Sequence, residues 1–203
     1  MRLPHQRGWK AQRMLGILYV AIALLWSSAS KAETRVYLLR GWFGVFSTGL
    51  DSVAAELRTK GIKAETVGHL AWKTTVANII KWHASGNSGP LVLVGHSQGA
   101  NNVIDMARLL QRENIPVDLL VTLAPAGQDP IPGNVVRAIN YYNSPGWGTA
   151  DAGYRGKLTN INLGGDTGIN HMAIDKNPRI QAEIERAIVS VPQPQAQVEA
   201  QAR

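Results

Sequence analysis

The chain lacks cysteine entirely, although it has 203 residues. Without cysteine it forms no disulfides and cannot carry a lipid on an N-terminal cysteine. The histidines and carboxylates show no metal-ligand spacing, and the sequence contains neither a phosphate-binding Gly-rich loop nor a dinucleotide fingerprint. We therefore expect no metal and no other cofactor.

An apolar run long enough to span a membrane is also missing at the N-terminus. The stretch 15–26 is apolar over 12 residues, whereas a helix needs ~20 to cross a bilayer. It lies within 1–32, which has five basic residues and no acidic one, and Ser30 and Ala32 place small side chains at the positions typical of signal cleavage. We predict that 1–32 is a signal peptide cleaved after Ala32, and that the protein is periplasmic or secreted. An uncleaved segment would instead be a membrane anchor.

Strong charge of either sign is absent from the rest of the chain. Five of the 21 Lys and Arg residues lie in 1–32, so 16 basic residues face 14 acidic ones and the net charge falls from +7 to about +2. No basic stripe with interleaved aromatic residues remains, and we expect no nucleic-acid partner. Residues 33–190 suffice for one domain with one core, and the composition of 191–203 predicts a disordered tail. The oligomeric state stays open.

Strand-like and helix-like segments alternate along the predicted domain, which indicates parallel strands joined by helices. The stretch 124–134 contains Pro and Gly and leaves no room for a crossover helix. We predict a three-layer α/β/α sandwich with a mostly parallel central sheet and no cap domain. The expected strands are 36–40, 62–67, 91–94, 117–123, 135–142 and 158–163, and the expected helices include 50–57, 76–80, 100–112 and 178–188.

The most informative motif is Gly95-His96-Ser97-Gln98-Gly99, which lies between a buried-type strand and a helix. This context is that of a nucleophile elbow, a sharp turn that holds a serine exposed for attack. Glycine at both ends fits such a turn, because Cβ atoms there would clash with neighbouring backbone. The motif predicts Ser97 as the nucleophile.

With this elbow, a Gly-rich turn at 41–44 and a histidine after the last strand, the chain resembles the α/β-hydrolase superfamily, and within it the small lidless lipases and esterases. The resemblance covers most of the chain after residue 32. It implies an α/β-hydrolase fold and a catalytic triad in the order serine, acid, histidine. Only His171, after the strand 158–163, fits the position of the base.

The acid of the triad has more than one candidate. Asp151 follows the penultimate strand, where small lipases of this superfamily commonly carry the acid, and Asp129 follows the strand before. Asp166 lies only five residues before His171, so it is less able to approach the imidazole from the far side. We predict Asp151, with Asp129 as the alternative, although neither directly follows its strand.

The resemblance also implies an oxyanion hole made by the backbone amides of Gln98 and Trp42. Many relatives carry His-Gly-x-Gly-Gly at the turn after the first strand, and Arg40 stands here in place of the histidine. Phe43 and Phe46 flank the same turn, and with Trp42 they could line an acyl site. Three further tryptophans are interpreted as packing or surface residues: Trp72, Trp82 and Trp147.

These patterns predict an exported serine hydrolase that cleaves a small-molecule ester or a lipid through a Ser-His-Asp triad and an acyl-enzyme. A thioesterase or acyltransferase would use the same residues. A non-catalytic binding protein on the same fold is a further alternative, which the irregular position of the acid supports. The membrane is a partner only if the N-terminal segment stays uncleaved.

Overall fold

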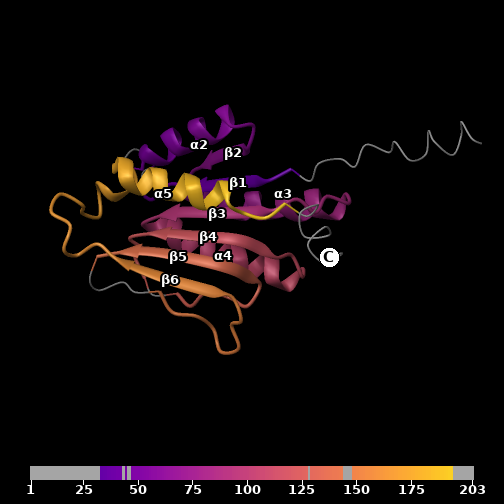
Figure 1. Cartoon of the computed structure of the whole chain (residues 1–203). Helices are drawn as coiled ribbons and strands as arrows, with labels where there is room; N and C mark the ends of the chain where they lie inside the picture. The colour runs from indigo at the N-terminus through magenta and orange to yellow at the C-terminus, as the bar shows by residue number, and fades with distance from the viewer. Residues whose placement is uncertain (1–32, 43, 45–46, 128, 144–147, 194–203) are drawn as a thin grey trace, which may run out of the picture. The chain divides into compact units, whose positions relative to one another are not determined.

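A computed structural model of the protein describes residues 33–42, 44, 47–127, 129–143 and 148–193 (Figure 1). All of them lie in one compact unit, Ala32–Arg203. The predicted signal peptide lies outside the described residues. Within the described ranges, no helix has the length and apolar character needed to cross a membrane.

The centre of the described domain is a six-stranded sheet in which every pair of neighbouring strands is parallel. The strand order is β2-β1-β3-β4-β5-β6, so the elbow strand β3 lies inside the sheet. All six residues of β3 are buried, as expected for an apolar strand covered on both faces. The strands are β1 (Arg35–Leu39), β2 (Lys63–Val67), β3 (Leu91–His96), β4 (Val117–Leu123), β5 (Val135–Tyr142) and β6 (Lys157–Asn162).

Helices cover both faces of the sheet. Helices α2 (Gly49–Thr59) and α5 (Pro178–Val189) pack on one face, where Leu50, Val53 and Ile184 share a core cluster with Val92 and Val94 of β3. On the other face, α3 (Trp72–Ala84) and α4 (Gln98–Arg112) form a second cluster with the alternate residues of the same strands. The predicted three-layer α/β/α sandwich with a parallel sheet is therefore confirmed (Figure 1).

Local signals at the ends of elements account for their boundaries. The Asn177 side chain accepts hydrogen bonds from the amides of Arg179 and Ile180, and Pro178 occupies the first position of α5, a combination favoured at the start of a helix. Ordered packing continues past the predicted domain end at residue 190, because Val191 is buried in the core and Gln193 bonds Thr34. The remainder of the predicted tail, 194–203, lies outside the described residues.

The links from β4 to β5 and from β5 to β6 contain no helix among the described residues. The first link runs alongside α4: Ala126 donates to the Asn101 side chain, and further along Asn134 donates to the carbonyl of Ala107. The second link is joined to the first, because the amide of Asp151 donates to the carbonyl of Ile131. Both links therefore pack against the α4 face of the sheet.

Candidate active site

The turn between β3 and α4 has the geometry of a nucleophile elbow. Ser97 has φ 57° and ψ −123°, a backbone conformation that costs a non-glycine residue roughly 1–3 kcal/mol. A Cβ on Gly95 would lie 2.3 Å from the carbonyl oxygen of Gly99, and a Cβ on Gly99 would lie 2.3 Å from that of Leu39 in β1. Both glycines are thus required by close backbone contacts, as the sequence predicts.

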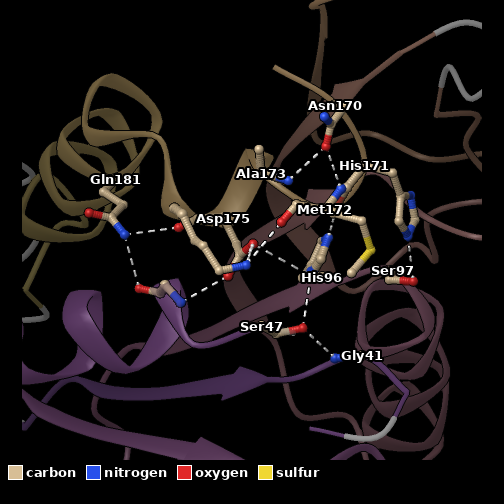
Figure 2. Close-up of polar contacts among 12 residues, drawn as sticks. Gly41, Ser47, His96, Ser97, Asn170, His171, Met172, Ala173, Asp175 and Gln181 are labelled. Carbon is tan, nitrogen blue, oxygen red and sulfur yellow. Dashed lines mark hydrogen bonds and ion pairs between the residues drawn. The ribbon is translucent and has the colours of Figure 1, made fainter. Parts of the chain in front are cut away.

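His171 lies beside the serine. Its Nε2 is 2.8 Å from Ser97 Oγ, which is hydrogen-bond distance for a general base and its nucleophile (Figure 2). His171 is exposed, and Ser97 is half-buried. The structure therefore brings together the two residues that the sequence assigns as nucleophile and base.

The loop that carries His171 connects β6 to α5 and is ordered by its own hydrogen bonds. Asn170 Oδ1 accepts from the amides of Met172 and Ala173, at 2.9 and 3.0 Å. A short 3-10 helix, η2 (Ile174–Lys176), follows, and Lys176 Nζ donates to the carbonyl of Met172. These contacts fix the turn around His171 without involving its imidazole.

His96, the residue before Ser97, forms a buried link between two loops. Its Nε2 lies 2.7 Å from the carbonyl oxygen of His171, and its Nδ1 lies 2.8 Å from Ser47 Oγ. Ser47 Oγ in turn accepts a hydrogen bond from the amide of Gly41 (Figure 2). Only 1% of the His96 surface is exposed, and this burial lowers its pKa from the ordinary value of 6.5. His96 is therefore neutral near pH 7.

The turn after β1 passes directly beside Ser97. A Cβ on Gly41 would lie 3.0 Å from Ser97 Cβ, so only glycine leaves this approach free of crowding. The Gly41 amide is engaged by Ser47, and the Trp42 amide comes next along the chain. Gln98 is the first residue of α4, where backbone amides have no partner within the helix. Arg40, at the start of the same turn, pairs with Asp51 of α2.

Neither of the predicted acids reaches His171. Asp129 Oδ2 accepts from the Asn101 side chain on α4, and Asp151 is held by its backbone to Ile131. Asp166 forms an ion pair with Arg179 at the start of α5. Among the described residues, no carboxylate makes a hydrogen bond or ion pair with the His171 imidazole. The physical reason is that Asp129 is held against α4 by Asn101, and the chain at Asp151 is bonded to the same link through Ile131.

Sequence reasoning missed Asp175, a carboxylate in η2 that is 1% exposed. Its Oδ2 accepts from the amide of Gly49, and its Oδ1 lies 4.0 Å from His96 Nδ1 and 3.6 Å from Lys176 Nζ. The Oδ1 atom has no hydrogen-bond partner. Nothing in the local sequence separates Asp175 from an ordinary turn aspartate, because its partner Gly49 lies 126 residues away.

Large apolar side chains are exposed around the site. Trp42 is 59% exposed, Leu70 85% and Met172 44%, and they belong to the turn after β1, the 3-10 helix η1 (His69–Ala71) and the His171 loop. Trp42 stacks on His69, and a groove of about 600 Å³ is lined by Trp42, Gly44 and 68–71. The other predicted lining residues, Phe43 and Phe46, lie outside the described residues.

The remaining tryptophans differ in their surroundings. Trp72 packs against the core cluster on the α3 and α4 face, and the guanidinium of Arg35 lies 4.6 Å from the ring centre of Trp82. Both match their interpretation as packing or surface aromatics. Trp147 lies outside the described residues.

No family model matches the sequence, and no curated protein matches it significantly. Solved structures with a similar backbone include the type II thioesterase BorB from the borrelidin biosynthetic cluster, with 12% identity and a TM-score of 0.47 over 77% of this chain and 93% of the other. The type II thioesterase YbtT of the yersiniabactin NRPS/PKS pathway has 12% identity and a TM-score of 0.45 over 83% of this chain and 95% of its own.

A third similar structure is a Xanthomonas campestris pv. campestris protein described as a hydrolase of the alpha/beta superfamily. It has 17% identity and a TM-score of 0.40 over 75% of this chain and 98% of its own. Identities this low do not transfer an activity, since one fold hosts many functions. The parallel sheet, its strand order and the strand–Ser97–helix turn give the chain an α/β-hydrolase-like fold, as the resemblance predicted.

Proposed function

We propose that the protein is an exported serine hydrolase that cleaves carboxylic esters through an acyl-enzyme on Ser97. The observation that carries the proposal is the 2.8 Å contact between His171 Nε2 and Ser97 Oγ at a strained elbow. A serine hydroxyl is a weak nucleophile unless an adjacent base takes its proton. The strain at Ser97 supports the same role, because strained backbone persists where the surrounding structure requires it and clusters at active sites.

In the proposed reaction, Ser97 Oγ attacks the ester carbonyl carbon while its proton passes to His171 Nε2. The tetrahedral intermediate then expels the alcohol, which takes that proton from His171. A water molecule attacks the resulting acyl-enzyme, again giving a proton to His171, and the returning proton restores Ser97 as the carboxylic acid leaves. His171 thus acts as base and acid in each half of the reaction.

The developing oxyanion is assigned to the backbone amides of Gln98 and Trp42. Gln98 supports this assignment because it combines a first-turn amide with the positive end of the α4 dipole. Trp42 supports it because it directly follows Gly41, whose backbone approaches Ser97 closely. Removal of one such donor typically costs about 2.7–4 kcal/mol of transition-state stabilisation.

The exposed apolar side chains favour a substrate with an apolar acyl group. Leu70 and Trp42 line a groove that begins one residue from Gly41, and Met172 directly follows His171. Burying this surface against an acyl chain would contribute about 25 cal/mol for each Å² removed from water. We therefore propose that the acyl chain lies along the groove between Trp42 and Leu70.

The experiment compares turnover of ester and thioester substrates that share one acyl group, using the wild type, Ser97→Ala and His171→Ala. The proposal expects ester hydrolysis that both substitutions abolish while circular dichroism shows a retained fold. Preference for the thioester would identify a thioesterase instead, since only the leaving group differs. A folded wild type that hydrolyses neither substrate would favour the non-catalytic binding protein.

Export is part of the proposal and has its own test. The basic segment with its short apolar stretch in 1–32 supports a cleaved signal peptide. N-terminal sequencing of protein recovered from outside the cytoplasm should begin at Glu33. Protein that keeps its first residues and sediments with membranes would instead identify an anchor.

A further inference from the structure

We propose that His96 and Asp175 are positioning residues that hold the catalytic histidine through the backbone of its loop. No described residue places a carboxylate on the His171 imidazole. In this arrangement His96 and Asp175 orient His171 in place of such a carboxylate. The inference deepens the proposed function and rests on it for its kinetic tests. It rests separately on the buried geometry of the two side chains, which can be tested without any substrate.

The direction of each hydrogen bond in the buried link follows from the chemistry of its atoms. The carbonyl oxygen of His171 can only accept, so His96 Nε2 must carry the proton and donate it. Because His96 is neutral, Nδ1 is then an acceptor, and the Ser47 hydroxyl must donate to it. The same hydroxyl oxygen accepts from the Gly41 amide. The link is a chain of donors that runs from Gly41 through Ser47 and His96 to His171.

This chain connects the two loops that the reaction needs. At one end is Gly41, which lies against Ser97 and precedes Trp42, the assigned oxyanion donor. At the other end is the carbonyl of His171, whose imidazole contacts Ser97 Oγ. The rings of His96 and His171 are also neighbours, with centres 5.3 Å apart. One buried side chain therefore fixes both loops relative to the nucleophile that follows it in the sequence.

Asp175 fixes the same loop at a second point, four residues after His171. Its Oδ2 accepts from the amide of Gly49 at the start of α2, and Gln181 of α5 donates to the carbonyls of both Gly49 and Asp175. The fit is tight, because a Cβ on Gly49 would lie 2.0 Å from the Asp175 carbonyl oxygen. Figure 2 shows the two contacts, at the His171 carbonyl and at Asp175, that hold this short segment. With both points fixed, we expect His171 to stay beside Ser97.

Two substitutions of His96 separate the donor from the bulk of the ring. An asparagine amide reaches about as far as Nδ1, whereas a glutamine amide reaches toward Nε2 and can still donate to the His171 carbonyl. We expect His96→Asn to lower kcat at least about tenfold with KM nearly unchanged, since small misplacements of a catalytic group cost up to about 100-fold. His96→Gln should restore most of kcat. Equal kcat in wild type and His96→Asn would overturn the proposal.

Asp175 has a matched control in Asp118, which also accepts a backbone amide, that of Leu91, but at the start of β3. We expect Asp175→Ala and Asp118→Ala to lower Tm by similar amounts, and only Asp175→Ala to lower kcat. A similar fall of kcat in both variants would reduce Asp175 to a residue of general stability and contradict its positioning role. If either variant fails to fold, the milder pair Asp175→Asn and Asp118→Asn applies the same comparison.

A measurement on the unmodified protein tests the geometry without substrate. In a ¹⁵N-histidine NMR spectrum at neutral pH, His96 should show a neutral ring with the proton on Nε2 and slow exchange with water. A proton on Nδ1, or a charged ring, would overturn the donor chain even if the protein is active. The correct tautomer in a protein without turnover would instead count against the proposed function and leave the link intact.

Discussion

Two regions follow the ends of neighbouring strands beside the candidate active site: the loop from β6 to α5, and the links after β4 and β5. Among the described residues, only the first of these regions brings a side chain to Ser97. The loop from β6 to α5 brings His171 within 2.8 Å of Ser97 Oγ. The link after β4, which contains Asp129, bonds to α4, and the chain at Asp151 bonds to that link. Asn143, at the start of the link after β5, donates to the carbonyl of Ile169 in the His171 loop, but no described carboxylate of either link contacts His171. The comparison teaches that the polar partners of a loop, and not its place after a strand, decide which side chain reaches the site.

The partners of the two regions differ in kind. The His171 loop is held by two buried residues, namely His96, which precedes Ser97, and Gly49 at the start of α2. The link with Asp129 is held by Asn101, one turn into α4. A loop fixed beside the elbow can serve catalysis, whereas a loop fixed along a helix face serves packing.

The largest effect is expected when Ser97 or His171 is replaced, because the first region, the loop from β6 to α5, brings these two side chains together. Ser97→Ala and His171→Ala should each lower kcat by at least about 10³-fold, because nucleophile and base act as one unit. Steady-state hydrolysis of the preferred ester provides the measurement, with near-wild-type Tm as the control for folding. Activity that survives His171→Ala would remove this loop from the mechanism.

A second test of the first region disturbs the contact between Gly49 of α2 and Asp175, which holds the His171 loop. In Gly49→Ala the new methyl group would meet the Asp175 carbonyl oxygen, so the loop or α2 must shift. We expect a loss of about 1–3 kcal/mol in the free energy of unfolding, together with a lower kcat. Gly165→Ala in the same loop is the control, since no atom lies within 4 Å of its Cβ position. If the contact between Gly49 and Asp175 were unimportant, chemical denaturation would give both variants the same free energy of unfolding.

The pH dependence of stability sharpens the comparison, because the first region contains a buried histidine. The folded-state pKa of His96 is lowered by burial, opposed by the hydrogen bond to His171 and by Asp175. The unfolded state therefore binds the proton more readily, and stability should fall as the pH drops below about 6.5 toward the folded-state pKa. His96→Gln should flatten this part of the curve. Burial raises the pKa of Asp118 from 3.8 in the folded state. Protonation of Asp118 should therefore increase stability as the pH falls further, which is opposite to the effect of His96.

The apolar groove gives a smaller effect that depends on the substrate. Leu70→Gln should lower kcat/KM severalfold for esters of long acyl chains and leave acetyl esters nearly unchanged, because only a long chain covers position 70. Val189→Gln on α5 is the matched control, since Val189 is also exposed, at 56%, but belongs to a different surface. An equal loss for both chain lengths would place the acyl chain elsewhere.

The smallest change in kcat is expected for substitutions in the second region, the links after β4 and β5. Asp151→Asn and Asp129→Asn should each leave kcat within about twofold of the wild type, because neither carboxylate contacts His171. Asp129→Asn should lower stability by about 0.5–1.5 kcal/mol, as it weakens the hydrogen bond with Asn101. A large fall of kcat in either variant would mean that the aspartate approaches His171 during turnover.

The features of the protein that the sequence could predict depend on local patterns. The strand before Ser97, the glycines at 95 and 99 and the helix that follows are encoded within a short stretch, and the order of residues along the chain identifies His171. The absence of Asp129 and Asp151 from His171 could not be predicted, because it depends on the hydrogen bonds of Asp129 with Asn101 and of Asp151 with Ile131. The roles of Ser47 and Asp175 also depend on contacts between distant residues, with Ser47 meeting His96 from 49 positions away.

The most direct test of the central claim is the rate at which a fluorophosphonate labels Ser97, with the adduct located by mass spectrometry. The account predicts rapid labelling of the wild type, an unchanged rate in the double variant Asp129→Asn and Asp151→Asn, and a loss of labelling in His171→Ala. Labelling that disappears in the double variant would contradict the account, because it would show that a carboxylate from the second region activates the serine.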